Sequence, residues 1–226
     1  MRLTCLCILF LSSCTGYLGT STLQYRSNDF ILIDSAKPTH PGFLIKGESQ
    51  DFPIYYIGPI NDSISIGKRY WTGKTFYPEA LPKSFISTYD CSELEIKADT
   101  SVFCYSSIDY LGEGGRNIDD SSQWFHAFLL ILKNKSDSTL YLGRTSSLFY
   151  IQLEGQCRDG QWTSIQKPLS EEWICGTGEP DIYLRPGEII LSKIKRRNDH
   201  DFVRYRLAWK GGGKVIDRKS TRLNSS

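Results

Sequence analysis

The chain has 226 residues, of which 40% are hydrophobic and 13% aromatic, and its 27 basic residues nearly balance 25 acidic ones. This content is sufficient to bury one or two hydrophobic cores. The near-neutral charge does not favour binding to nucleic acid or to an anionic lipid surface, because both attract a basic face. We therefore expect no nucleic-acid partner.

The N-terminus predicts an export signal. Arg2 is followed by an apolar run over residues 3–11, which is far shorter than the ~20 residues of a membrane-spanning helix and fits the core of a secretory signal peptide. The run ends in Leu11-Ser12-Ser13-Cys14, which resembles the lipobox of bacterial lipoproteins. The alternative is an ordinary signal peptide cut near Gly16 or Gly19, in which Cys14 has no special role.

The resemblance to bacterial lipoproteins implies that residues 1–13 are removed and that the Cys14 thiol carries a lipid. Each methylene of a lipid chain contributes about 0.8 kcal/mol to membrane binding, so several chains anchor a protein firmly. Thr15 follows the cysteine where Asp would signal retention, which in this family implies the outer membrane of a two-membraned bacterium. The resemblance therefore implies a lipid-anchored protein of the cell envelope, with the membrane as a partner.

The rest of the chain is typical of an all-β protein. Short runs rich in Ile, Tyr, Val and Phe alternate with Gly, Pro, Asn and Asp, which are strand and turn signals. We expect a tether over residues 14–50, a first β unit over 51–112, a linker over 113–122 and a second β unit over 123–216. A single larger sandwich is the alternative.

Two pairs of segments suggest that the β units are duplicated. Residues 62–68 and 137–144 both have a polar turn, alternating apolar residues, a glycine and a cation, and residues 93–102 resemble 181–190. Such repetition is typical of duplicated supersecondary units. Chance similarity between strand–turn–strand segments is the alternative.

Strands are clearest in the second unit. Residues 125–133 are apolar at successive positions, which predicts a central strand covered on both faces. Further strands are expected at 139–142, 148–153, 161–165, 181–184, 188–195 and 202–209, before a glycine turn at 211–213 and another strand at 214–216. So many short strands favour a sandwich.

The segment Leu184-Arg-Pro-Gly-Glu188 resembles the strand and turn that precede an outer strand in immunoglobulin-like domains. The antibody-type Cys…Trp…Cys spacing is absent. The predicted fold is an immunoglobulin-like β-sandwich, arranged as two tandem β units.

The last ten residues, 217–226, are a polar segment that a widely used sequencing-library adapter would encode when read in frame. We therefore predict an artefact that belongs to no fold; a natural polar tail is the alternative. The segment carries three basic residues and one acidic residue, so the preceding chain is electrically neutral. On the first interpretation the strand at 214–216 is cut short and leaves an unpaired edge.

Four cysteines lie outside the predicted signal and anchor, namely Cys91, Cys104, Cys157 and Cys175. An even count in an exported chain predicts two disulfides. Pairing between near neighbours favours Cys91–Cys104 and Cys157–Cys175, and the second bond closes a loop of about 17 residues, worth ~3 kcal/mol. A metal site is the alternative, but the spacings do not resemble paired CxxC motifs, so we expect no metal.

No catalytic motif fits its context. Ser164-Ile-Gln-Lys167 matches the SxxK motif of serine acylases, but it lies in an expected strand, whereas that motif needs the lysine one helical turn after the serine. His126 lies inside an apolar strand and is expected to pack there, while His200 lies among turn-forming Asn and Asp residues. We therefore expect no enzyme activity, no catalytic residue and no cofactor.

Two surfaces are candidate binding sites. The first is a segment rich in aromatic rings, which suit sugar stacking or protein contact; its residues are Tyr70, Trp71, Phe76 and Tyr77. The second is the hairpin over 193–206, whose cations suit an anionic glycan or phosphate; they are Lys193, Lys195, Arg204 and Arg206. The alternatives are rings that cap the first core and a solvated sheet face.

Taken whole, the chain resembles β-sandwich lipoproteins of the envelope of two-membraned bacteria. The resemblance implies a non-catalytic binding or scaffolding lipoprotein whose partner is a glycan or an envelope protein. The alternative is an accessory subunit or inhibitor of a secreted hydrolase.

Overall fold

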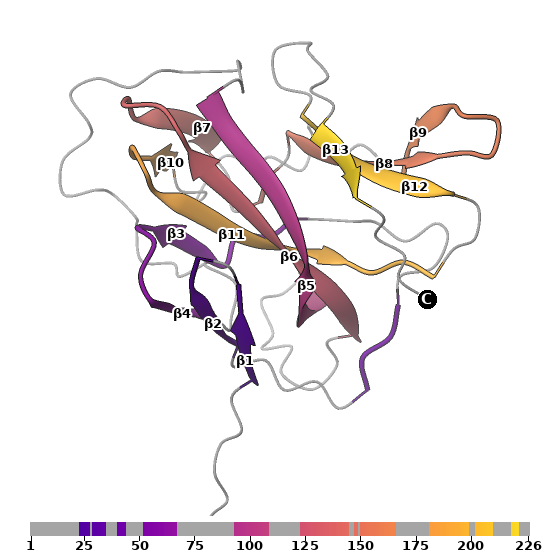
Figure 1. The fold of residues 1–226 in the computed structure, drawn as a ribbon, viewed down its shortest axis with the longest axis horizontal. Helices are drawn as coiled ribbons and strands as arrows, with labels where there is room; N and C mark the ends of the chain where they lie inside the picture. The colour runs from indigo at the N-terminus through magenta and orange to yellow at the C-terminus, as the bar shows by residue number, and fades with distance from the viewer. Residues whose placement is uncertain are drawn as a thin grey trace, which may run out of the picture.

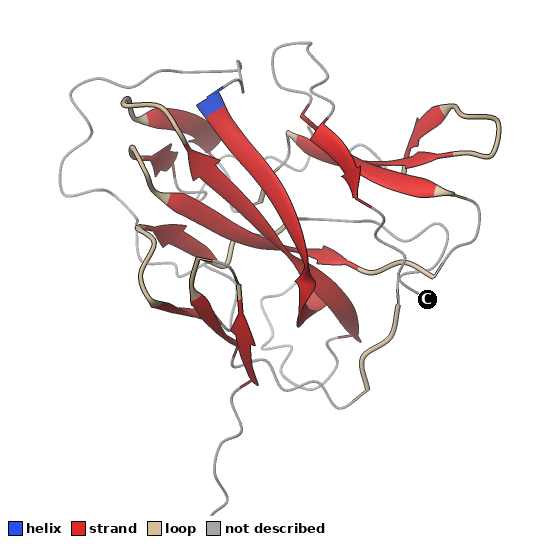
Figure 2. Cartoon of the chain, in the orientation of Figure 1, coloured by secondary structure: helices blue, strands red, loops and turns tan. Residues whose placement is uncertain are grey.

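The computed structural model describes residues 23–27, 29–34, 40–43, 52–66, 93–108, 123–144, 147–148, 150–165, 181–198, 202–209 and 218–221. Within these residues the structure is all-β, as the sequence predicted, and contains no α-helix (Figure 2). A single 3₁₀ residue, Glu93, precedes one of the strands.

The strands of the described residues form four sheets (Figure 1). An N-terminal sheet contains, in spatial order, β1 (Leu23–Arg26), β2 (Ile31–Asp34) and β4 (Ser63–Ile66). The central sheet contains β3 (Tyr56–Gly58), β11 (Ile189–Lys195), β6 (Gln123–Asn134) and β5 (Leu94–Ile108). A two-stranded sheet contains β10 (Asp181–Leu184) and β7 (Leu140–Arg144), and the C-terminal sheet contains β13 (Arg218–Thr221), β12 (Arg204–Trp209), β8 (Ile151–Gln156) and β9 (Trp162–Ser164).

The strand β6 lies in the middle of the central sheet and is covered on both faces, which confirms the prediction for residues 125–133. It pairs antiparallel with β5 and with β11. Leu130 and Leu132 belong to the larger hydrophobic core on one face, while Leu129 and Ile131 belong to a second core on the other face. Because successive side chains of a strand point to opposite faces, a strand covered on both faces is apolar at most successive positions, as β6 is.

The N-terminal sheet covers one face of the central sheet. The predicted tether over 14–50 is therefore wrong for the residues of β1 and β2. In β2, Leu32 and Asp34 are buried, and in β4, Ile64 and Ile66 are buried, each at every second position. This alternation is the pattern of strands with one face against a core. Strands β2 and β4 pair in parallel, and the second core lies beneath them.

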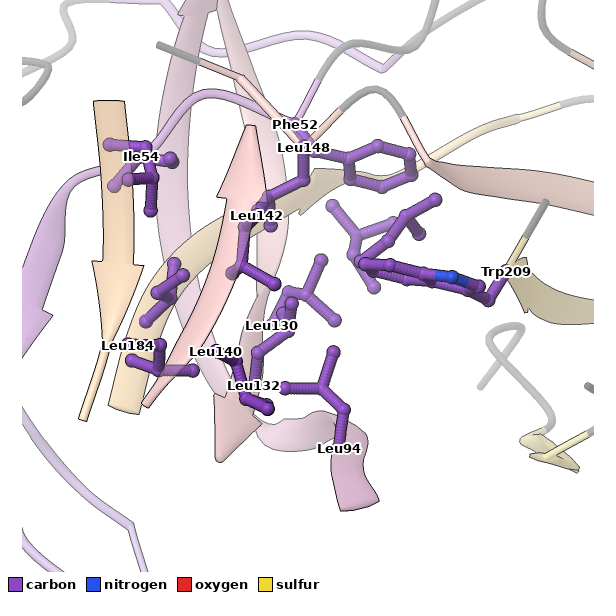
Figure 3. Close-up of a cluster of buried hydrophobic side chains, with 14 of the residues drawn as sticks. Phe52, Ile54, Leu94, Leu130, Leu132, Leu140, Leu142, Leu148, Leu184 and Trp209 are labelled. Carbon is purple, nitrogen blue, oxygen red and sulfur yellow. The ribbon is translucent and has the colours of Figure 1, made fainter. Parts of the chain in front are cut away.

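The larger core lies on the other face of the central sheet, where strands β7, β8, β10 and β12 pack against it. Figure 3 shows this core, in which Leu130 and Leu132 of β6 meet Leu140 and Leu142 of β7, with Trp209 of β12 at one side. Sheets that pack face to face around an apolar interior are the architecture of a β-sandwich.

The linker predicted at 113–122 does not divide the described strands into two units. Strands β5 and β6, which flank it in sequence, are neighbours in one sheet, and β3 of the predicted first unit pairs with β11 of the second. The proposed repeat is not reflected in pairing either, because β4 pairs with β2 whereas β7 pairs with β10. Strand pairing here follows long-range contacts, so the described strands form one connected set of layers.

Residues 218–221 form β13, which pairs antiparallel with β12. The prediction that 217–226 belongs to no fold is therefore wrong for these four residues. Without β13, β12 would be an edge strand, whose free backbone N–H and C=O groups can pair with another segment through its backbone, whatever the side chains of that segment are. The expected strand at 214–216 lies outside the described residues.

Candidate functional site

The feature that best fits a binding site is a group of aromatic rings around Arg196, at the end of the central sheet where β6 begins. The Arg196 guanidinium carbon lies over three phenylalanine rings, 5.2 Å from the centroid of Phe43, 5.4 Å from Phe103 and 5.1 Å from Phe128. We call this group the Arg196 cluster; its members are Phe43, Phe103, Tyr105, His126, Phe128 and Arg196.

Backbone pairing brings these residues together from four segments. Phe103 of β5 is the register partner of Phe128 of β6, and Tyr105 is the partner of His126. The Arg196 N–H donates to the His126 carbonyl over 2.7 Å, just after β11 ends. Phe43 follows Gly42, which pairs with β6 at Phe125 in a parallel bridge. Residues distant in sequence therefore share one face of the sheet.

A bulge in β5 decides which residues face the cluster. Asp99 is paired with Leu129, and the next paired residue, Phe103, is opposite Phe128, so residues 100–102 are extra on β5. Asp99 accepts hydrogen bonds from the Ser101 backbone N–H and from the Ser27 hydroxyl, both over 3.1 Å, which stabilises this irregularity. An odd number of extra residues moves the following side chains of a strand to the opposite face of the sheet. Phe103 therefore joins the cluster and Cys104 faces the interior.

The cluster is accessible. The side chains of Phe43 and Phe103 are 38% and 45% exposed, whereas Phe128 beneath them is 2% exposed. Within the described residues no oxygen acceptor is bonded to the Arg196 guanidinium, whose contacts are with rings. Cation–π contacts of this kind contribute about 0.5–2 kcal/mol each, but they leave the five guanidinium N–H donors available to oxygen ligands.

His126 adds a polar ring to the cluster without adding charge at neutral pH. Its ring stacks on Phe43 with centroids 4.7 Å apart and lies 5.6 Å from the Tyr105 ring. Burial, and then the nearby positive charge of Arg196, lower the pKa of His126 below its ordinary value. Arg196 is therefore the cluster's charged group at pH 7.

A hollow open to solvent adjoins the cluster. It leaves room for about one water molecule, and its lining residues are Phe128, Leu153, Ile194, Lys195, Arg196, Arg197 and Tyr205. Cavities that enclose drug-sized ligands are far larger, about 300–1,000 Å³. A ligand of the cluster would therefore lie on the exposed rings beside the Arg196 guanidinium rather than inside this hollow.

The basic hairpin predicted at 193–206 does not form a basic face. Lys193 and Lys195 are 0% and 1% exposed, because the central sheet is covered on both faces. Both side chains point to the face of the sheet that carries the second core. Arg206 pairs with Glu154 over 2.8 Å and lies 4.2 Å from the centroid of the Trp162 ring. Of the four predicted cations, Arg204 alone is exposed.

Lys193 instead forms a buried ion pair with Asp34. Its Nζ donates to Asp34 Oδ2 over 2.9 Å and to the Tyr105 carbonyl over 2.6 Å, and it lies 4.3 Å from the centroid of the Tyr55 ring. Burial lowers the pKa of Lys193, but Tyr55, Cys104 and Asp34 outweigh burial, so the net pKa is raised. This pair links the N-terminal sheet to the central sheet and is closed to solvent.

The described cysteines differ from the predicted pairing. Cys104 is buried and Cys157 is half-buried, and both are free thiols in the structure. Their expected partners, Cys91 and Cys175, lie outside the described residues, as does Cys14. Burial, partly offset by Lys193, raises the pKa of Cys104 to about 12, so this thiol is protonated and unreactive at neutral pH.

The predicted aromatic surface, formed by Tyr70, Trp71, Phe76 and Tyr77, also lies outside the described residues. So do Lys167 of the SxxK match and His200, while Ser164 is an exposed residue of β9. Sequence reasoning missed the Arg196 cluster, because its members come from distant segments and the β5 bulge changes the face of Phe103. The position of Phe103, just before the buried Cys104, does not by itself indicate which face of the sheet its side chain occupies.

Among the described residues, no group of three or more His, Cys, Asp or Glu side chains is placed to hold a metal ion. The same part of the chain contains no helix whose length and apolar character would let it cross a membrane. Comparisons of the chain with protein-family models, with curated proteins and with solved structures each find no match.

Proposed function

We propose that this protein is a non-catalytic binding module of the cell envelope that is held at the membrane by a lipid on Cys14. The observation that carries the binding function is the Arg196 cluster. Exposed aromatic rings offer a large contact area at low entropy cost, and an arginine among them supplies directed hydrogen bonds. The ligand class consistent with this surface is a glycan or an envelope protein.

The strand order supports an immunoglobulin-like scaffold for this module. Strands β5, β6 and β11 are neighbours in one sheet, and β9, β8, β12 and β13 are neighbours in the facing sheet. Immunoglobulin-like domains have this order, with strands A, B and E in one sheet and C′, C, F and G in the other. The proposed scaffold is a single sandwich with an added N-terminal sheet, rather than two tandem units.

A lipid on Cys14 would hold the module near the membrane surface. Nine residue steps separate Cys14 from Leu23, the first residue of β1, and a fully extended chain of this length spans at most about 30 Å. A short attachment suits a module that binds a component of the envelope itself, such as a glycan layer next to the membrane.

The anchor and the binding surface are tested separately. Full-length protein expressed in a two-membraned bacterium should incorporate labelled palmitate, and a Cys14→Ala variant should not. For the surface, purified full-length protein in detergent should be retained on immobilised envelope glycans, and a Phe43→Ser/Phe103→Ser variant should lose this retention. The matched control is Val203→Ser, which removes another exposed apolar side chain, 55% exposed, outside the cluster.

An unlabelled, soluble wild-type protein would overturn the anchor. Equal retention of the double variant and the wild type would show that the ligand does not bind at the Arg196 cluster.

A further inference from the structure

The Arg196 guanidinium is an open site for a single anionic group. Three aromatic rings surround it, and within the described residues its N–H donors are not bonded to any oxygen of the protein. Aromatic rings balance part of the positive charge but are weak acceptors, so the donors are available to a ligand. Carboxylates and phosphates match the planar fork of donors of a guanidinium.

The surroundings of Arg196 select among anions. A polymer of phosphates binds through several cations at once. Lys193 and Lys195 of the preceding strand β11 are buried, and Arg197, which lines the hollow, is already engaged in an interaction. Arg196 is the cluster's single charged group at neutral pH. The neighbouring apolar surface consists of the exposed rings of Phe43 and Phe103. The ligand therefore carries one charge per binding unit, next to an apolar face of about the size of a ring.

The shape of the sheet disfavours a peptide at this position. Strand β5 is the edge of the central sheet, so a bound peptide would extend that sheet by pairing with β5. The bulge at residues 100–102 interrupts β5 immediately before Phe103, and bulged edges discourage the addition of a strand. An acidic side chain on an extended peptide is therefore a poorer fit than a sugar that stacks on the rings.

We propose that the Arg196 cluster binds the carboxylate of a uronic acid unit, and that the ligand is an acidic polysaccharide. The carboxylate accepts hydrogen bonds from the Arg196 guanidinium, and the C–H face of the same pyranose ring packs on Phe103 or Phe43. This inference rests on the proposed binding function and names the ligand class of that site.

The test measures binding of full-length, detergent-solubilised protein to a galacturonate hexamer by calorimetry, beside a neutral galactose hexamer and inorganic polyphosphate. The wild type should bind the galacturonate hexamer in preference to the other two. Arg196→Gln should weaken binding by about tenfold or more, because it removes a hydrogen-bonded charge pair. Arg196→Lys keeps the charge but not the planar fork of donors. Its affinity for the galacturonate hexamer should therefore lie between those of the wild type and Arg196→Gln.

The matched control is Arg158→Gln, which removes an equal charge from an exposed turn between β8 and β9 and should bind like the wild type. Circular dichroism checks that each variant is folded. If Arg196→Gln does not fold, Phe103→Leu replaces it, since this variant keeps Arg196 and removes an exposed ring; it should bind the hexamer more weakly than the wild type.

Unchanged affinity of a folded Arg196→Gln, or of Phe103→Leu where it is the replacement, would overturn the proposal. So would equal binding of the neutral hexamer, or preferential binding of polyphosphate. If the wild type does not bind the galacturonate hexamer but is still retained on other envelope glycans through Phe43 and Phe103, the uronate assignment fails and the proposed binding function stands.

Discussion

Lys193 and Asp34 form an ion pair in which neither side chain is exposed to solvent, although 159 positions separate them in sequence. Lys193 belongs to β11 of the central sheet and Asp34 ends β2 of the N-terminal sheet. The pair therefore links the two sheets by a polar contact, in addition to the apolar core between them. A buried charge without a partner is costly, so the pair also determines how the two layers fit.

The first prediction concerns this pair. Lys193→Met or Asp34→Asn alone should lower the free energy of unfolding by about 3–5 kcal/mol, because the remaining group is left buried without its partner. The double variant Lys193→Met/Asp34→Leu should be markedly more stable than either single variant. Urea denaturation measures all of them. Single variants within 1 kcal/mol of the wild type would show that the pair is not buried in solution.

The second prediction concerns the β5 bulge. Asp99→Ala removes the acceptor for the Ser101 N–H and the Ser27 hydroxyl, and leaves these groups without their partner. The expected loss in unfolding free energy is about 1–3 kcal/mol. Because the bulge sets the face of Phe103, binding at the Arg196 cluster should weaken too. Ser101→Ala is the comparison: it removes the hydrogen bond from the Ser101 hydroxyl to Asp99 but keeps those from the Ser101 N–H and the Ser27 hydroxyl, so its effect should be smaller. An equal effect of both variants would contradict this role of Asp99.

The third prediction concerns the cysteines. Because Cys104 is buried and its pKa is raised to about 12, it should resist alkylation at pH 8 in the folded protein and react once the protein is unfolded. Cys157, which is half-buried, should react in the folded state. Peptide mapping without reduction also tests the disulfides predicted from sequence: a Cys91–Cys104 or Cys157–Cys175 cross-link would contradict the free thiols of the structure.

The same thiol gives a dependence of stability on pH. The folded-state pKa of Cys104, about 12, lies above the ordinary thiol pKa of 9.0, so the folded protein retains a proton that the unfolded chain releases. Stability from this group is complete below pH 9 and declines as pH rises toward 12. Cys104→Ala should lose less stability than the wild type between pH 8 and pH 10, measured by urea denaturation at each pH. Parallel pH profiles would contradict the assignment.

The fourth prediction concerns the C-terminal residues. Deletion of 217–226 removes β13 and exposes the outer edge of β12, so the protein should lose about 1–3 kcal/mol of stability and aggregate more readily. Deletion of 222–226, which keeps β13, is the control and should have little effect. Equal melting temperatures and aggregation rates for both truncations would restore the prediction that the tail belongs to no fold.

The sequence alone determined the all-β class and the places of most strands after residue 123, whereas it assigned β1 and β2 to a tether. The unbroken apolar run at β6 indicated a strand buried on both faces, and the turn around Gly187 indicated the end of β10 and the start of β11. Gly187 has a φ of +74°, a conformation that glycine adopts without a steric penalty. These features are local, because periodicity and turn chemistry are set by residues that are neighbours in the chain.

Tertiary structure alone decided the pairing of layers and the candidate site. Strands β1 and β2 form a sheet because β2 pairs with β4 over the second core. The tandem division is wrong because β5 and β3 pair with strands on the other side of the predicted linker. The Arg196 cluster depended on the bulge after Asp99. A shift of register moves every later side chain of a strand to the opposite face, so alternation read from the sequence cannot place Phe103 until the partner strand is known.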